Sequence, residues 1–220
     1  MHRSFVAGNP TRQQLIATLD GEDTTAYYTP MATTSRLPHL LARVHALRER
    51  LRAAQLDLVP PVPETDVVAF EARHQIRLPD EYRLFITEIS AGGDGPGIDG
   101  LMEFAGDDEF ERLAHPFPLT ALWNWDQDPK ADDAAIDLCK DGWLCLGHEG
   151  CTSEWVLIVT GEQRGQVWDV SSEGAQPCAP ALNFLDWYEL WFDWHENGEK
   201  QAWWDVVWAD YANAAATDLG

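Results

Sequence analysis

Three short apolar runs lie between residues 143 and 170, and polar segments that contain glycine separate them. The runs cover residues 143–146, 155–159 and 167–170, and each is rich in aromatic or branched side chains. Such runs at this spacing predict consecutive antiparallel strands. The middle run is apolar at every position, so we expect it to lie centrally in a sheet that is covered on both faces. The rest of the chain must supply that cover.

The connections between these runs are short. Residues 160–165 contain two glycines, Gly161 and Gly165, which can take the positive φ angles that a hairpin turn between the second and third strands needs. The segment His-Glu-Gly-Cys at 148–151 reads as a turn between the first and second strands. Residues 171–181 contain glycine and two prolines, and we expect a loop there.

A helical period precedes the strands. Apolar residues recur at intervals of three and four from Ser35 to the proline-rich stop at 60–63, and they are Leu40, Val44, Leu47, Leu51, Ala54 and Leu58. Four arginines lie mostly on the other faces of this helix: Arg43, Arg48, Arg50 and Arg52. They could form a nucleic-acid stripe, but beside an acidic body we favour docking onto that body or exposure to solvent.

Two shorter helices and a glycine-rich run follow. Thr65 can cap a helix with Val67, Phe70 and His74 inward, and Pro79 can open another with Tyr82, Phe85, Ile86 and Ile89 buried. The two helices would meet in a corner at Leu78-Pro79. Residues 91–100 hold five glycines and no lysine, which disfavours a phosphate-binding loop and favours a path from helix into sheet.

Aromatic residues dominate the C-terminal part. Asn183 can cap a helix that ends at Asn197-Gly198, with an apolar stripe of Phe184, Trp187, Tyr188, Trp191 and Trp194. A last helix over residues 200–212 would align Trp203, Trp204, Val207, Trp208 and Tyr211, and we favour its packing on the body. The pattern predicts an α+β fold, a mainly antiparallel sheet with helices packed on it and helical extensions at both ends. Its expected parts are an arm and helix at 1–60, a domain at 61–198 and a tryptophan-rich helix at 199–220.

The charge is strongly negative and unevenly distributed. The net charge is −22, yet residues 1–60 hold seven arginines and five acids, so the remainder carries −24. Such a surface repels nucleic acid and anionic lipid, and it favours simple solubility or a basic partner. No apolar run approaches the roughly 20 residues that span a membrane. The first ten residues lack the apolar core of a secretory signal. We therefore expect a cytoplasmic protein with reduced thiols.

The best candidate contact surface lies in the acidic segment before the first strand and at the strand ends. Two tryptophans flank aspartates in the sequence Trp-Asn-Trp-Asp-Gln-Asp at 123–128, although they could equally cover one face of the sheet. The candidate partner-binding residues are Trp123, Trp125, Asp126, Asp128, Asp132, Asp133, Glu149, Glu154 and Glu173.

No catalytic, cofactor or metal site is predicted. With thirty-seven acids, no carboxylate pair suited to acid and base chemistry can be singled out. His148, Glu149 and Cys151, with Cys145, suggest a metal site, but the spacing lacks a fourth ligand of an ordinary zinc site. The four cysteines form no C-x-x-C pair and read as buried small residues.

The order of motifs resembles the SUKH superfamily, which includes Smi/Knr-like fungal cell-wall-synthesis regulators and many bacterial proteins. The resemblance covers about residues 62–195. The motifs are Phe70-Glu71, the segment Leu-Pro-Asp-Glu-Tyr-Arg at 78–83, the glycines at 92–95, Leu101, His-Glu-Gly-Cys at 148–151, Val-Thr-Gly at 159–161, Arg-Gly-Gln-Val-Trp at 164–168 and Phe-Leu-Asp-Trp-Tyr at 184–188.

This resemblance implies an α+β fold without a shared catalytic set. Bacterial members are immunity proteins that bind and neutralise toxins, often nucleases, and such a role implies a cognate toxin with a basic surface as partner. We expect a monomer that binds neither nucleic acid nor membranes. The alternative is an intracellular adaptor or regulatory scaffold of the same superfamily, assembled through the terminal helices.

Overall fold

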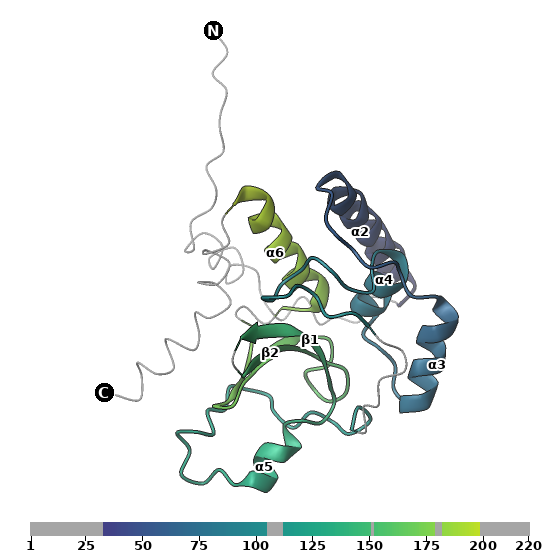
Figure 1. The fold of residues 1–220 in the computed structure, drawn as a ribbon. Coiled ribbons are helices and arrows are strands. Elements are labelled where there is room, and N and C mark those ends of the chain that lie inside the picture. The colour runs from purple at the N-terminus through teal and green to yellow at the C-terminus, as the bar shows by residue number, and fades with distance from the viewer. Residues whose placement is uncertain (1–32, 105–111, 151, 179–181, 199–220) are drawn as a thin grey trace. The chain divides into compact units, whose positions relative to one another are not determined.

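The computed structural model describes residues 33–104, 112–150, 152–178 and 182–198, and within these ranges the fold is α+β (Figure 1). The helices are α2 (Thr33–Ala53), α3 (Glu64–His74), α4 (Asp80–Glu88), α5 (Asp133–Leu138) and α6 (Phe184–Asn197). The strands are β1 (Trp143–Gly150), β2 (Ser153–Ile158), β3 (Val167–Val170) and β4 (Ala175–Pro177). The described residues from Leu40 onward belong to one compact unit. No helix in the described ranges is long and apolar enough to cross a membrane.

The sheet is antiparallel, with the strands side by side in chain order. The three predicted strands are confirmed, and β2 lies centrally with its last four residues buried. Two details of the prediction were wrong. β1 continues to Gly150 through the segment that we expected to be a turn, and β4 forms inside the expected loop at 171–181. β4 has no apolar run to reveal it, because its three residues include Gln176 and Pro177.

The two faces of the sheet have separate hydrophobic cores. Trp155 and Leu157 point to the inner face, where they join the larger core with α2, α3, α4 and α6. Val156 and Ile158 point to the outer face, where a smaller core forms with Trp168 and residues of the segment around α5. Figure 1 shows α4 and α6 on one side of the sheet and α5 on the other. The predicted cover on both faces is thus present.

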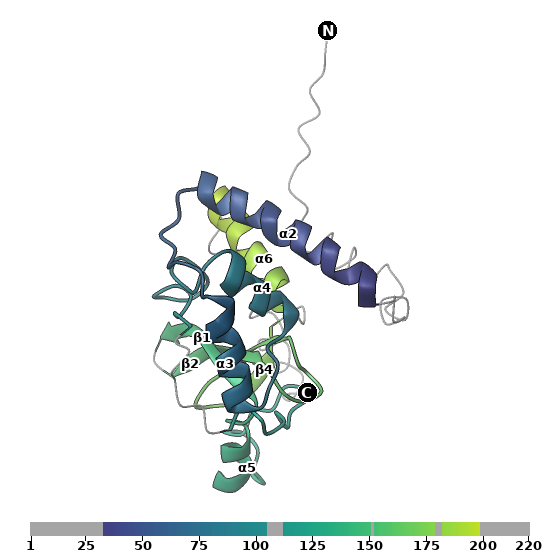
Figure 2. The same ribbon diagram turned by 90° about the vertical axis from the view of Figure 1, so that its right-hand side faces the viewer.

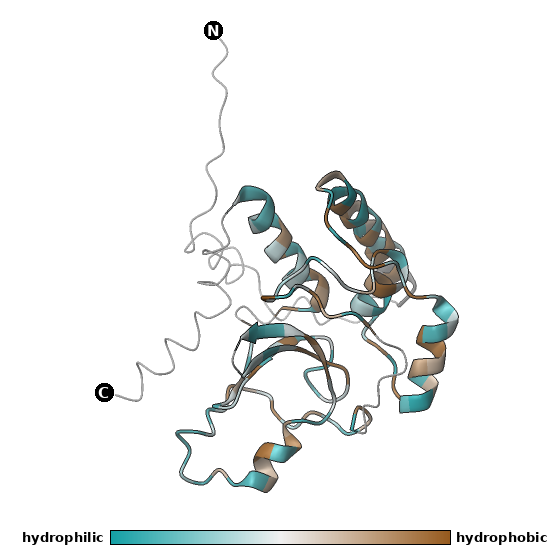
Figure 3. Cartoon of the chain, in the orientation of Figure 1, coloured by the Kyte–Doolittle hydropathy of each residue, from teal (hydrophilic) through white to brown (hydrophobic). Residues whose placement is uncertain are grey.

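Helix α2 contributes a row of side chains to the inner core. Leu40, Val44, Leu47 and Leu51 are all buried there. The helix ends at Ala53 rather than near Leu58, because the chain turns at Gln55 with a φ of 58°. Every helix in Figure 3 shows both hydrophilic and hydrophobic ribbon, as expected of helices with one buried side.

Three of the four predicted arginines of α2 dock onto acidic side chains of the body, as expected, whereas Arg52 pairs with Glu49 of the same helix. Figure 2 shows α2 alongside α6. Arg48 lies 3.5 Å from Glu88 of α4. Two other arginines each hold a pair of α6 carboxylates at 2.5–2.6 Å, Arg43 with Asp186 and Glu189, and Arg50 with Asp193 and Glu196. Ion pairs thus join two helices that both contribute side chains to the inner core.

The corner between α3 and α4 also forms as predicted, with one difference at its start. α3 begins after Pro63, so Thr65 lies inside the helix and does not cap it. In α4, which follows Pro79, the side chains of Tyr82, Phe85 and Ile86 are buried. The Glu71 carboxylate accepts a hydrogen bond of 2.8 Å from the backbone of Leu78, which holds the corner in place.

The glycine-rich run leads from α4 to the free edge of β1. Gly93 and Gly97 adopt φ values of 109° and 116°, in the region that favours glycine. Further along, the backbone N–H groups of Ile98 and Met102 donate to the carbonyls of His148 and Leu146 at 2.8 and 2.7 Å. The run therefore covers an edge that would otherwise expose unpaired backbone groups.

Helix α6 matches its prediction closely. The Asn183 side chain accepts a hydrogen bond of 3.0 Å from the backbone of Asp186, and the helix ends at Asn197 with Gly198 as its C-cap. Trp187 meets Trp155 of the sheet edge to face, with ring centroids 5.9 Å apart. The expectations for residues 1–32 and for a helix at 200–212 lie outside the described residues.

Candidate functional site

The β1–β2 turn, the β3–β4 turn and the loop at 123–128 lie together at one end of the sheet. The backbones of Trp123 and Ala175 exchange hydrogen bonds of 2.9 and 3.0 Å, and the Asp126 N–H donates to the Glu173 carbonyl at 3.1 Å. The hydroxyls of Thr152 and Ser172 lie 2.9 Å apart. Segments distant in sequence thus form one continuous surface at this end of the sheet.

Five predicted acids belong to this loop, to the β3–β4 turn or to the start of α5. They are Asp126, Asp128, Asp132, Asp133 and Glu173, and we call them the acidic loop surface. All except Asp128, which is half-buried, are exposed. Within the described ranges, none of the five forms a salt bridge. The surface therefore presents carboxylates whose charge no described basic side chain neutralises by direct contact.

Some members of this surface also hold its backbone in place. The Lys130 N–H and the Trp123 indole donate to the two Asp128 oxygens, each at 2.9 Å, and these hydrogen bonds lower the pKa of Asp128. Asp132 caps α5 by accepting a hydrogen bond of 2.8 Å from the backbone of Ala135. Asp126, Asp133 and Glu173 are exposed and have no comparable side-chain bond among the described residues.

The two loop tryptophans contribute to the outer core. Trp125 is only 7% exposed, its indole N–H donates to the Ser172 carbonyl at 2.8 Å, and its ring meets Trp123 edge to face. Trp123 is half-buried against the same core. Their packing fits the alternative from the sequence, in which the two tryptophans cover one face of the sheet. Trp125 has little surface left for a partner.

The strand-end acids Glu149 and Glu154 point to opposite faces. Glu149 faces inward, where its carboxylate accepts a hydrogen bond from the Trp155 indole. Burial raises the pKa of Glu149 to about 8, and the nearby Asp169 charge adds to this effect, although the indole hydrogen bond opposes it. Glu149 is thus separated from the acidic loop surface by the sheet.

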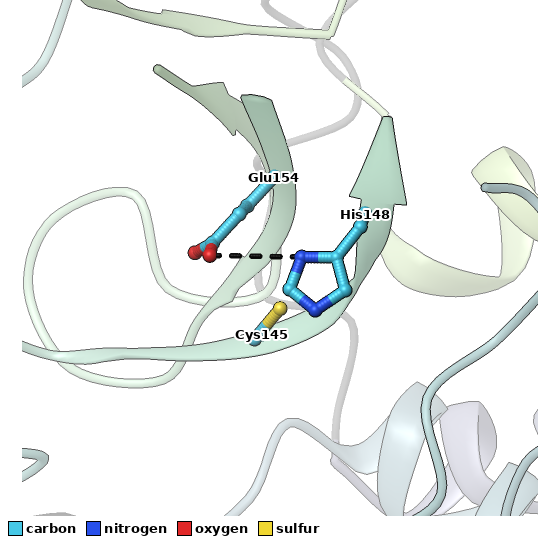
Figure 4. A group of neighbouring side chains, drawn as sticks. All are labelled: Cys145, His148 and Glu154. Atoms are coloured by element: carbon cyan, nitrogen blue, oxygen red, sulfur yellow. Dashed lines mark ion pairs between the residues drawn. The ribbon is translucent and has the colours of Figure 1, made fainter. Parts of the chain in front are cut away.

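Glu154 faces outward beside two side chains of β1. The His148 Nδ1 lies 3.6 Å from a Glu154 oxygen, and the Cys145 sulfur lies close to both residues (Figure 4). Burial raises the pKa of the Cys145 thiol to about 11, and the Glu154 charge adds to this effect. The sequence pattern had grouped Cys145 and His148 with Glu149 and Cys151. In the structure Glu154, and not Glu149, lies beside Cys145 and His148. Cys151 lies outside the described residues.

Sequence reasoning missed a buried acid on β3. Asp169 of β3 is 3% exposed on the inner face, and burial raises its pKa to about 6 despite hydrogen bonds from Ser153 and Gln176. Nothing in the run Val-Trp-Asp-Val distinguishes a buried aspartate from one at a strand edge.

A model of the SMI1 / KNR4 family (SUKH-1) matches residues 61–190, which is more than half of the chain. The chain belongs to this SUKH-1 family. The matched range contains the helix corner, the glycine-rich run, all four strands and the first half of α6, so the resemblance seen in the motifs is confirmed. No curated protein and no solved structure gives a significant match. Family membership supports a role like that of an immunity protein or of a Smi1/Knr4-type regulator.

Proposed function

We propose that this protein is a non-catalytic immunity protein. It would bind a toxin with a basic surface, such as a nuclease, and neutralise it by covering that surface. Membership in the SUKH-1 family supports the general role. The finer assignment rests on the acidic loop surface.

The observation that carries the proposal is that no described basic side chain pairs with the carboxylates of the acidic loop surface, whereas those of α6 are paired. On α6, four carboxylates are paired with arginines of α2. The five carboxylates of the acidic loop surface have no such partners among the described residues. Unpaired charges of one sign raise the rate of encounter with an oppositely charged protein and favour the correct orientation. A nuclease that grips phosphates supplies the complementary positive surface.

The predicted contact residues would then have two roles. Asp126, Asp133 and Glu173 would meet the toxin directly. Trp123, Trp125, Asp128 and Asp132 would hold the loop in its shape. Glu154 lies on the same face of the sheet, whereas Glu149 lies on the other and is left out of the proposed contact. The same negative charge disfavours binding to nucleic acid and to anionic membranes. We propose that the protein acts as a monomer in the cytoplasm.

Co-expression with a toxin domain encoded next to this gene tests the proposal. Cell survival is scored first, and the association rate of the purified pair is then measured at low and high salt. The decisive variant is Asp126→Lys/Asp133→Lys/Glu173→Lys. We expect its association rate to fall about tenfold or more at low salt and its salt dependence to flatten, because steering is lost.

A matched control carries the same change in net charge elsewhere. The variant Asp66→Lys/Glu103→Lys/Glu162→Lys reverses three exposed acids, of which Asp66 lies in the first turn of α3 as Asp133 does in α5. It should keep most of the wild-type rate. Equal losses in both variants would show that total charge matters rather than this surface. No rescue and no complex, together with retention of several host proteins in a pull-down, would favour the regulatory scaffold instead.

A further inference from the structure

Three different metal-ligating side chains meet on the outer face of the sheet. None of them belongs to the acidic loop surface. The Cys145 sulfur, a His148 ring nitrogen and a Glu154 carboxylate oxygen all lie within 4.8 Å of one another. Figure 4 shows them converging from β1 and β2, with the imidazole next to both other groups. Sulfur, nitrogen and oxygen donors together form the mixed set that borderline-soft metals prefer.

A β-bulge brings two of these side chains onto the same face. In a regular strand, residues three apart point to opposite faces. Here Cys145 pairs with Val156 and Gly147 with Trp155, so Leu146 is an extra residue on β1. The extra residue reverses the alternation after it, and His148 therefore shares the outer face with Cys145. Glu154 is the direct cross-strand partner of His148.

The bulge is held firmly from the other side of β1. The carbonyl of His148 accepts a hydrogen bond of 2.8 Å from Ile98 in the glycine-rich run, and that of Leu146 accepts one of 2.7 Å from Met102 just after the run. A Cβ at Gly147 would lie 2.8 Å from the Gly100 carbonyl oxygen, so only glycine fits at this point. Because both edges of the bulged segment form hydrogen bonds, the backbone positions of Cys145 and His148 are fixed before any ligand binds.

We propose that Cys145, His148 and Glu154 form a binding site for Zn²⁺. Hard cations such as Mg²⁺ and Ca²⁺ take oxygen ligands and would leave the thiolate unused. Zinc bonds of about 2.0–2.3 Å in tetrahedral geometry place ligand atoms roughly 3.3–3.8 Å apart, so the group must close by about 1 Å. The His148 side chain is 50% exposed and that of Glu154 is 36% exposed, so both have room to rotate toward the Cys145 sulfur. The fourth position then faces solvent and takes a water molecule.

The test uses the full chain, reduced and metal-free, with Co²⁺ as the spectroscopic probe. We expect one equivalent of Co²⁺ to give a thiolate-to-cobalt charge-transfer band, and Zn²⁺ to displace it. Cys145→Ala should abolish the band, and His148→Gln and Glu154→Gln should each weaken binding by at least about tenfold. Zn²⁺ should also raise the melting temperature of the wild type and not of Cys145→Ala, because binding to the native state stabilises it.

Controls separate this site from other ligands in the chain and from loss of fold. Cys139→Ala removes a buried thiol in another part of the fold, and Glu173→Gln removes an exposed carboxylate, and both should bind Co²⁺ as the wild type does. Circular dichroism of each variant confirms that it is folded. The proposal is overturned if the wild type gives no charge-transfer band, or if the band survives in Cys145→Ala. Because no ligand belongs to the acidic loop surface, either result leaves the immunity proposal untouched.

Discussion

At the scale of single residues, the inner face of the sheet contains two acids, of which Asp169 is buried and Glu149 is half-buried. Asp169 and Glu149 both point toward the core below α6, with the Cys178 thiol nearby, and burial raises the pKa of all three. Among the described residues, no basic side chain pairs with either carboxylate. Asp169 depends instead on hydrogen bonds from the Ser153 hydroxyl and the Gln176 amide. A charged Asp169 therefore destabilises the folded state near neutral pH.

Asp169→Asn should stabilise the protein at pH 7 and have little effect near pH 4. The pKa of Asp169 rises from 3.8 to about 6 on folding, so the folded state binds the proton more tightly and loses stability as pH rises through this window. The uncharged amide of the substituted side chain avoids this loss. The Gln176 side-chain oxygen, which has no partner in the described structure, can turn to accept a hydrogen bond from that amide. The difference in unfolding free energy should grow from less than about 1 kcal/mol near pH 4 to about 3 kcal/mol at pH 7. Urea unfolding of both proteins at the two pH values measures it, and an equal difference at both would contradict a desolvated carboxylate.

At the scale of elements, α2 is an integral part of the inner core from Leu40 onward. Its buried row packs in the same cluster as α4 and α6. The predicted boundary near residue 60 rests on the proline-rich stop and stays a prediction.

Leu47→Ala should destabilise the whole fold by about 2–5 kcal/mol, because it leaves a cavity where a side chain that is 1% exposed had packed. Leu37→Ala is the matched control on the same helix, since Leu37 is 51% exposed and its loss should change stability by less than about 0.5 kcal/mol. Urea unfolding monitored by tryptophan fluorescence distinguishes the two. If Leu47→Ala left the transition unchanged, α2 would be a detachable arm.

At the scale of the whole molecule, net charge acts against compactness. The chain carries −22, and its arginine–carboxylate pairs on α2 and α6 are partly exposed, where such pairs contribute little. The same excess that would guide a basic toxin therefore repels itself within the folded chain.

Added salt should stabilise the protein over the range in which screening changes most. Between about 10 and 150 mM NaCl the Debye length shortens from about 30 to 8 Å, which weakens repulsion between separated carboxylates. We expect the melting temperature to rise across this range and to level off above it. A fall in melting temperature would mean that the ion pairs between helices outweigh the repulsion.

The sequence by itself determined the elements whose signals are local. The apolar run at β2, the Asn183 cap of α6 and the proline that opens α4 each act through neighbouring residues, so each could be predicted. The ordered series of motifs was likewise sufficient to indicate the family.

Only the tertiary structure decided which of these side chains meet. β4 forms because β3 offers it a partner. His148 shares a face with Cys145 because a bulge in β1 reverses the alternation between them, and it lies beside Glu154 because the two residues pair across the strands. The acids divide into buried, loop-holding and exposed groups for the same reason. Strand register and the packing of distant segments depend on contacts between residues far apart in the chain, and a local pattern carries no record of them.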